Sequence, residues 1–315
     1  MAAGSTSVRT ATPGGPLLGV ARPRQGERVI KGLLFASAMV SVLTTIGIVA
    51  SLLGETIRFF GEISIVDFFT GGEWSPLFSD PQFGIRPLVV GTLTITAIAL
   101  VVAVPLGLGC AIYLSEYAKP RVRKVLKPVL EILAGVPTVV FGFFALTFFT
   151  PTVLKDFLGL EVGTFNALSA GIVVGLLVLP TIASVAEDAM SAVPGALREG
   201  SYGLGASKRQ TSMRVVFPAA LSGIVAAIVL GASRAIGETV IVLVAGGAIA
   251  TNKIDPTKSM ETMTAFIAAT GKGDIATGST AYKTIFAVGM TLFVLTLLIN
   301  VVAIRFVRRF RQVYE

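Results

Sequence analysis

Histidine is absent from this chain of 315 residues, and cysteine and tryptophan occur once each, as Cys110 and Trp74. One thiol and no imidazole exclude an intrachain disulfide, a zinc site built on histidine and cysteine, and histidine-based acid–base catalysis. A phosphate-binding GxxxxGKS/T loop is missing too, because TGKGD at residues 270–274 lacks the upstream glycine and the hydroxyl residue after Lys272. We therefore expect no enzymatic activity, no metal and no cofactor in this chain.

Charge is scarce as well: charged residues make up only 14% of the chain, whereas hydrophobic residues make up 53%. Several apolar runs are long enough to cross the ~30 Å hydrocarbon core of a bilayer at ~1.5 Å per helical residue. This composition predicts an all-α integral membrane protein. Six transmembrane helices are expected, near residues 33–54, 87–114, 128–149, 168–188, 222–247 and 284–304.

The net charge of +8 is unevenly placed. Eighteen of the 26 Lys and Arg residues lie in tails and connections on one side of these spans, seven lie on the other side, and Arg234 remains inside a span. The positive-inside rule makes the richer side cytoplasmic, so we expect a multi-pass protein of a bacterial cytoplasmic (inner) membrane with both termini in the cytoplasm. The charge then reflects topology and the lipid bilayer, and no nucleic-acid partner is expected.

The chain divides into two regions by composition. Residues 1–32 are rich in Gly, Pro, Ser and Thr and predict a flexible cytoplasmic N-terminal tail, and residues 33–315 form the expected transmembrane domain. The apolar run after Lys31 is too long for the core of a cleaved signal peptide.

Prolines and glycines interrupt the predicted spans. Pro105, Pro137 and Pro180 are expected to kink helices, either to line a cavity or only for packing. Small residues permit close approach of neighbouring helices, here Gly135, Gly142, Gly171 and Gly175. The aromatic and acidic segment around Trp74 suits an external loop, which serves either as an interfacial aromatic belt or as a docking surface for an external partner.

The connection at residues 194–223 reads PGALREGSYGLGASKRQTSMRVVFPAALSG. We expect a short helix at residues 199–204, a break at Gly205, and a second, basic helix capped by Ser207. Such a helix-turn-helix is suited to docking a partner, or to resting as an amphipathic helix on anionic lipid.

This segment resembles the coupling loop of ABC-importer permeases, whose motif begins Glu-Ala-Ala and continues through a glycine to a proline. Glu199, Gly205 and Pro218 match the motif, whereas Gly200 and Ser201 replace the two alanines. Four other segments, FGIRPLVVGTL, AGVPTVVFGFF, VLPTIASVAEDAM and SRAIGETV, resemble the phosphate ABC transporter permease subunits of PstC type, over about residues 60–245.

The resemblance implies a type I ABC-importer permease fold with a cytoplasmic coupling helix-turn-helix at about residues 194–222. It also implies an ATP-driven importer of inorganic phosphate, in which this permease forms the translocation path with a second homologous permease subunit. Two ATP-binding subunits would dock under the coupling loops at Glu199, Gly205 and Pro218, and an external phosphate-binding protein would deliver substrate. Gly205 would absorb the sharp turn of the loop.

Arg234 and Glu238 place two charges inside the fifth predicted span. Arg234 lies roughly 18 Å into that span, near the bilayer midplane, where an ionisable residue usually has a function. A guanidinium there can hold an oxyanion through two hydrogen bonds, and Glu238, one helical turn away, can pair with it when no ligand is bound. The pair is therefore either a substrate gate or a purely structural ion pair.

Other functions remain open at this stage. A permease for sulfate, molybdate or phosphonate would share the coupling loop, and selectivity could reside in the external binding protein. A proton-coupled carrier could use Arg234 and Glu238 as a relay, although the long cytoplasmic loop and the lack of an inverted repeat argue against it. The chain could also report transporter occupancy to signalling proteins, a role that no pattern in the sequence would reveal.

Overall fold

The computed structural model describes residues 25–310 of the chain, with side chains for residues 26–305. The chain divides into two units, residues 1–51 and 52–315, and helix α1 (Gln25–Glu62) crosses the boundary between them. Within the first unit, residues 26–51 of α1 are almost entirely exposed although they are strongly apolar, as expected of a helix surrounded by lipid. This helix begins eight residues before the predicted span, and residues 1–24 of the predicted tail lie outside the described part of the chain.

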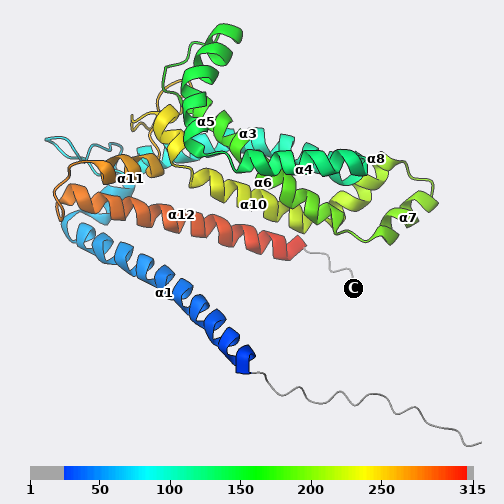
Figure 1. The fold of residues 1–315 in the computed structure, drawn as a ribbon. Coiled ribbons are helices and arrows are strands. Elements are labelled where there is room, and N and C mark those ends of the chain that lie inside the picture. The colour runs from blue at the N-terminus through cyan, green and yellow to red at the C-terminus, as the bar shows by residue number, and fades with distance from the viewer. Residues whose placement is uncertain (1–24, 311–315) are drawn as a thin grey trace, which may run out of the picture. The chain divides into compact units, whose positions relative to one another are not determined.

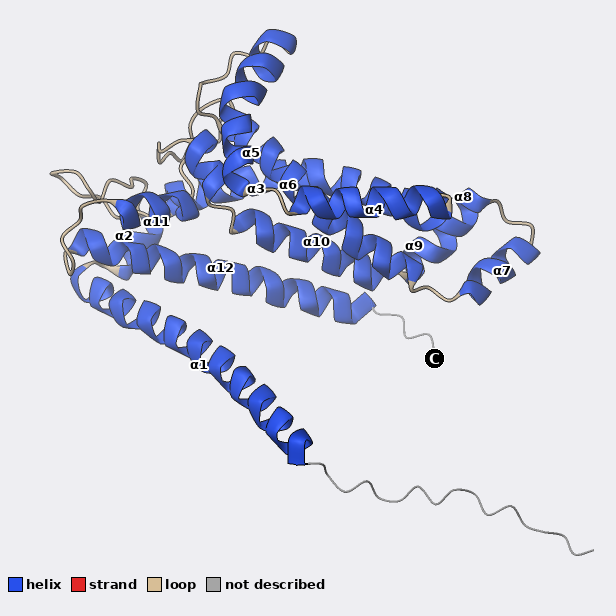
Figure 2. Ribbon diagram, viewed as in Figure 1, coloured by secondary structure: helices blue, strands red, loops and turns tan. Residues whose placement is uncertain are grey.

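The second unit is helical throughout its described part, with loops between the helices (Figure 2). Its α-helices after α1 are α2 (Ile65–Thr70), α3 (Arg86–Ile112), α4 (Pro120–Ala134), α5 (Thr138–Phe144), α6 (Ala167–Ser191), α7 (Gly195–Gly203), α8 (Lys208–Thr211), α9 (Phe217–Ala219), α10 (Leu221–Ile236), α11 (Met263–Lys272) and α12 (Thr280–Phe310). Four π-helical segments complete it: η1 (Tyr113–Tyr117), η2 (Ala145–Phe157), η3 (Ser212–Val216) and η4 (Val242–Gly246).

Among the described residues, five helices are long and apolar enough to span a membrane, and one bent pair of helices makes a sixth if the two together form a single span. The pair consists of residues 208–219 and α10, which meet at an angle of 71°. The all-α class is therefore confirmed, and the predicted number of six spans is reached when the bent pair counts as one span. Figure 1 and Figure 2 show α7 and α8 at one end of this unit, which we call the loop end, and α11 with α2, labelled in Figure 2, at the other.

The third span differs from its prediction. Residues 128–134 belong to α4, a separate helix with basic and apolar faces, and the span itself is α5 continued by η2, residues 138–157. The break falls at Gly135 and Val136, because Gly135 ends α4 and the residue before Pro137 is pushed out of helical geometry. Pro137 thus begins a helix rather than kinking one.

The fifth span also differs. α10 ends at Ile236, Gly237 is its C-terminal cap, and a second short helix begins only at Val240. The predicted continuous helix over residues 222–247 is therefore wrong. Glycine has low helix propensity, and the side chain of Glu238 binds backbone N–H groups that a continuous helix would use internally.

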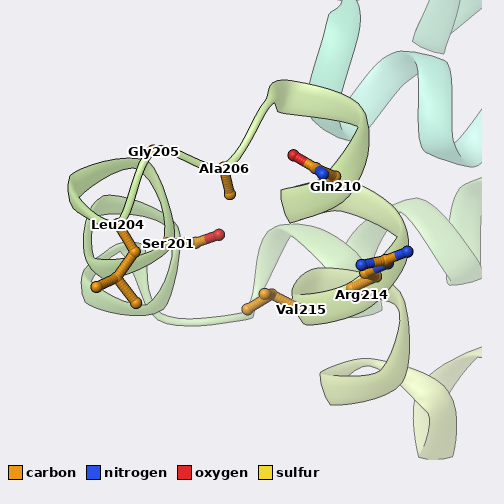
Figure 3. A pocket seen from close by; sticks show the side chains of 7 residues that line it. All are labelled: Ser201, Leu204, Gly205, Ala206, Gln210, Arg214 and Val215. Atoms are coloured by element: carbon orange, nitrogen blue, oxygen red, sulfur yellow. The ribbon is translucent and has the colours of Figure 1, made fainter.

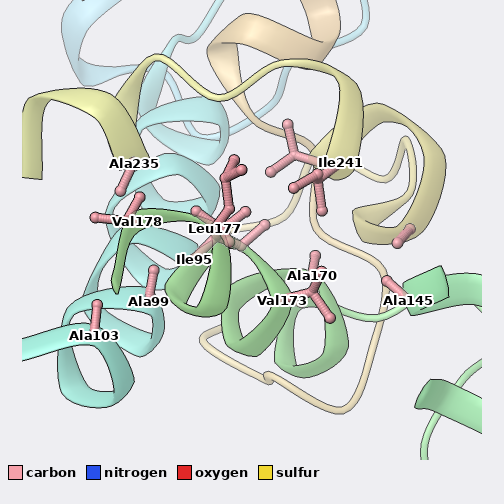
Figure 4. Packing of buried hydrophobic residues seen from close by; sticks show 14 of the residues in the cluster. Ile95, Ala99, Ala103, Ala145, Ala170, Val173, Leu177, Val178, Ala235 and Ile241 are labelled. Atoms are coloured by element: carbon pink, nitrogen blue, oxygen red, sulfur yellow. The ribbon is translucent and has the colours of Figure 1, made fainter. Parts of the chain in front are cut away.

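The centre of the second unit is formed by α3 lying along α6, with α10 and η4 against them (Figure 4). Small residues line this contact. A Cβ atom on Gly175 would lie 2.8 Å from the carbonyl oxygen of Ala99, and one on Gly171 would lie 2.7 Å from the side chain of Ile98. The predicted use of Gly171 and Gly175 for close helix approach is confirmed.

Two smaller hydrophobic clusters lie at the ends. One joins aromatic residues of the α11 end, where the ring of Trp74 is buried and contacts Phe266 with the ring centroids 4.9 Å apart. Trp74 is therefore a core residue, and in its loop Leu77 and Phe78 are the exposed apolar side chains. The other cluster lies at the loop end, where Val216 and Ile224 pack against Ala186 and Met190 of α6.

Candidate functional site

Arg234 lies in the last turn of α10, 13 residues after Leu221 and so roughly 20 Å along the helix. Its guanidinium Nη1 donates a hydrogen bond to the hydroxyl of Thr181 on α6, at 3.0 Å. The neighbouring Ser233 donates to Asn300 Oδ1 on α12, at 2.7 Å. Arg234 as a whole is half-buried.

The expected ion pair between Arg234 and Glu238 is not formed. Among residues 26–305 no carboxylate oxygen lies within 4.0 Å of the Arg234 guanidinium. Because α10 ends before Glu238, that residue does not lie one helical turn along from Arg234. The buried Glu238 carboxylate instead accepts hydrogen bonds from the N–H groups of Val240 and Ile241, at 3.0 and 3.2 Å.

Glu238 therefore caps the N-terminus of the short helix that follows the break. Its own carbonyl accepts a hydrogen bond from the Thr264 hydroxyl, at 2.7 Å, which fixes the break against α11. The end of α10, the start of the next helix and Arg234 thus meet at this break. None of the described carboxylates forms an ion pair with the Arg234 guanidinium. Chemically, the arrangement can accept an oxyanion at Arg234.

The connection at residues 194–223 forms a helix-turn-helix as predicted, but its first helix, α7, begins at Gly195 and not at Glu199. α7 is followed by a turn at Gly205, and the next helix is capped by Ser207, which exchanges hydrogen bonds with Gln210 in a capping box. Gly205 has a φ of +81°, and a Cβ atom there would meet nothing within 4 Å. Glycine is therefore favoured by backbone conformation and not by lack of space.

The two other matched residues of the motif occupy different environments. Glu199 is exposed on α7 and takes part in none of the ion pairs found among residues 26–305. Pro218 is exposed within the first positions of α9, next to the bend that leads into α10. η3 runs into α9 without a break, so Pro218 lies near the end of the continuous helical segment 208–219, which the bend then separates from α10.

The loop has two arms, α7 and the helical segment of α8 and η3. Between them lies a shallow groove of about 340 Å³ (Figure 3). The hydroxyls of Ser201 and Thr211 lie 2.9 Å apart and tie α7 to α8. Leu204, at the tip, is 91% exposed. The groove is lined by Ser201, Leu204, Gly205, Ala206, Gln210, Arg214 and Val215.

Two buried carboxylates at the loop end were not identified from the sequence. Glu187 on α6 is bound by Arg123 and Lys127 of α4, and Glu116 on η1 is bound by Arg198 of α7. The sequence offers one signal, which is an acidic residue at the end of an apolar run in YLSEYA and in VAEDAM. This signal does not identify which of the many basic residues forms the ion pair with each carboxylate.

A comparison with family models matches residues 103–312 to the inner membrane component of binding-protein-dependent transport systems. This match contains the break at Arg234, the coupling loop and the third to sixth spans. It covers about two thirds of the chain.

Individual relatives agree with the match. A probable ABC transporter permease protein, YqgH of Bacillus subtilis (strain 168), is 34% identical over 89% of this chain and 90% of its own length. Phosphate transport system permease protein PstC 1 of Mycobacterium tuberculosis (strain ATCC 25618 / H37Rv) is 33% identical over 92% of this chain and 96% of its own.

Solved structures agree on the fold. A chain of a bacterial alginate ABC transporter, in complex with an alginate pentasaccharide-bound periplasmic protein, superposes with a TM-score of 0.63 at 19% identity, over 93% of this chain and all of that one. The all-helical architecture found above is thus that of an ABC importer permease. From the family match and the relatives together, the chain belongs to the inner membrane component family of binding-protein-dependent transport systems.

Proposed function

We propose that this chain is the transmembrane permease subunit of an ATP-driven importer of inorganic phosphate. The single observation that carries the choice of phosphate is the set of relatives named as phosphate transport system permeases, which match over most of both chains. A family member of this size forms half of a translocation path, so a second homologous permease completes it.

Arg234 is the residue that we assign to the substrate path, with Glu238 beside it. Arginine keeps its charge in any protein environment and offers parallel N–H donors that fit a phosphate oxyanion. In this chain the guanidinium is held by Thr181 on one side only, and no described carboxylate neutralises it. Glu238 contributes by fixing the break at which Arg234 lies, through its bonds to Val240 and Ile241.

The coupling loop is the proposed docking site for two ATP-binding subunits, one on each permease. Glu199 and Leu204 are exposed there, and Gly205 sets the angle between the two arms. The loop end then faces the cytoplasm, in agreement with its many Lys and Arg residues, and an external phosphate-binding protein delivers substrate at the α11 end. Hydrolysis in the partners would move the loop and rock the packed helices.

Uptake of labelled phosphate in cells that express all partner subunits tests this function. Replacing Arg234 with glutamine removes two charge-assisted hydrogen bonds, so we expect uptake to fall about a hundredfold, for a loss of ~3 kcal/mol. Arg234→Lys keeps the charge without the planar pair of donors and should retain part of the activity. Arg58→Gln is the matched control, because Arg58 is an exposed arginine whose partner is Glu55.

Competition identifies the substrate in the same assay. Excess sulfate, molybdate or phosphonate should leave phosphate uptake by the native chain unchanged. Suppression by one of these oxyanions would move the assignment to a permease for that anion. Full uptake by Arg234→Gln at matched membrane abundance would instead make Arg234 a structural residue.

A further inference from the structure

The carboxylate of Glu116 is buried at the loop end, with only 3% of its side chain exposed. Glu116 belongs to η1, which continues α3 without interruption. The guanidinium of Arg198 on α7 donates to its Oε1 from Nη2 at 2.9 Å and from Nε at 3.2 Å. A buried carboxylate requires such a partner, so the first arm of the coupling loop is joined to the end of α3.

Arg198 binds two further acceptors. Its Nη1 donates to the carbonyl oxygen of Val193 at 2.6 Å, and its Nη2 donates to that of Met190 at 2.8 Å. These carbonyls lie in the last turn of α6 and in the connection to α7. One guanidinium therefore joins α7, the end of α6 and the end of α3.

The second arm of the loop reaches the same short segment. The Lys208 ammonium of α8 lies over the ring of Tyr117, 5.2 Å from its centroid, and Tyr117 follows Glu116 directly. Val216, at the end of that arm, is fully buried against Ala111 and Met190. Both arms thus hold the end of α3, and α3 lies along α6, the helix whose Thr181 binds Arg234.

We propose that the Arg198–Glu116 contact is a positioning pair that transmits movement of the coupling loop to α3 and so to the helices around Arg234. The inference rests on the proposed function, because it assumes that the loop is moved by ATP-binding subunits. Neither residue is among those assigned above to the substrate path. Movement of α7 alone would have to break the pair, whereas movement of α7 together with α3 preserves it.

The test uses the complete transporter in proteoliposomes, with all partner subunits and the external binding protein. Two quantities are measured, the number of phosphate ions imported per ATP hydrolysed and the stimulation of ATP hydrolysis by the loaded binding protein. For Glu116→Ala we expect both to fall at least fivefold, while the basal rate of ATP hydrolysis and the co-purification of the ATP-binding subunits stay within twofold of the native complex. A residue that only stabilises the fold would lower assembly and all rates together.

Glu187→Ala is the matched control. Glu187 is an equally buried carboxylate at the same end with basic partners, but it joins α4 to α6, and its hydrogen bonds come from Arg123, Lys127 and Ser191, outside the coupling loop. We expect this variant to keep the native ratio of phosphate to ATP. Equal losses in Glu116→Ala and Glu187→Ala would overturn the proposal, as would a native ratio in Glu116→Ala.

Arg198→Lys decides the matter if Glu116→Ala does not assemble. Lysine keeps the positive charge but cannot bridge Glu116 and two carbonyl groups at once, so the ratio should fall two- to fivefold in an assembled complex. An unchanged ratio contradicts the proposal. If the native complex itself imports no phosphate, the proposed function fails and this inference fails with it, whereas native uptake with an unchanged variant removes the positioning role alone.

Discussion

Gly205 joins the two arms of the coupling loop with a φ of +81°, in open space. A β-branched side chain at such a φ costs on the order of 1–3 kcal/mol, whereas asparagine adopts this region more readily. We therefore expect Gly205→Val to lower phosphate imported per ATP about tenfold and Gly205→Asn to stay near the native ratio, measured in proteoliposomes at matched assembly. Native coupling in Gly205→Val would remove Gly205 from the coupling residues.

Glu261 carries a buried carboxyl group. It lies in the connection between η4 and α11, outside the spanning helices, and burial raises the pKa of its carboxyl to about 7. It lines a cavity of about 540 Å³ together with Trp74 and Phe266, and no other titratable side chain lines that cavity. The ionised form is therefore disfavoured in the folded protein.

The stability of the folded protein depends on pH because the pKa of Glu261 differs between the folded and unfolded chain. Between pH ~4.5 and ~7 the unfolded chain releases this proton before the folded chain does, so the contribution of Glu261 to the free energy of unfolding falls as pH rises. The penalty is complete above pH ~7 and amounts to roughly 3 kcal/mol, from a rise of about 2.5 pKa units. Glu261→Gln removes the penalty.

Thermal unfolding of the purified protein in detergent checks this effect. We expect Glu261→Gln to raise Tm by a few degrees at pH 8 and to leave it unchanged at pH 4.5. Glu161→Gln, an exposed control, should follow the native protein at both values. Equal Tm values for native and Glu261→Gln at pH 8 would show that the carboxyl is solvated.

At the scale of the helices, apolar length predicts that a span exists but not where it breaks. The third span begins about ten residues later than expected because residues 128–134 extend α4, which Lys127 holds against α6, and a new helix begins only after Pro137. The fifth span ends early because the carboxylate of Glu238 caps a new helix. The first outcome involves a tertiary partner that a local pattern does not contain, whereas the Glu238 cap is local and is overlooked when only apolar length is considered.

The close packing of α3 on α6 predicts the effect of a single added methyl group. At Gly175 it would lie 2.8 Å from the carbonyl oxygen of Ala99, so Gly175→Ala should destabilise the protein by ~1–3 kcal/mol. Gly109→Ala, on the exposed side of α3, adds the same group where nothing lies within 4 Å. In thermal unfolding in detergent, Gly175→Ala should have the lower Tm of the two, and equal values would contradict this packing.

At the scale of the whole molecule, the coupling loop could be predicted from its local motif, but its attachment could not. Arg198 and Glu116 are separated by 82 positions, and Arg234 and Thr181 by 53. Each basic residue had several acidic or hydroxyl side chains available in the sequence, and only the packing of α3, α6 and α10 selects one. Helix capping, which is local, was predicted correctly at Ser207 for the same reason.

The distribution of Lys and Arg residues predicts the orientation of the entire chain in the membrane. The loop end carries Lys and Arg in excess, so it should face the cytoplasm, and the connection near Lys253 should face outward. Cys110 is the only cysteine, so a Cys110→Ser background leaves no thiol in this chain, and Leu204→Cys and Lys253→Cys then introduce one exposed thiol each. A membrane-impermeant maleimide reports which side each thiol occupies.

In spheroplasts that lack the ATP-binding subunits, Lys253→Cys should be labelled directly and Leu204→Cys only after the membrane is permeabilised. The absence of those subunits keeps the loop uncovered, so protection of Leu204→Cys can arise only from the membrane barrier. The reverse pattern would place the coupling loop outside the cell, where no ATP-binding subunit could reach it. The proposed coupling through Arg198 and Glu116 would then lose its driving partner.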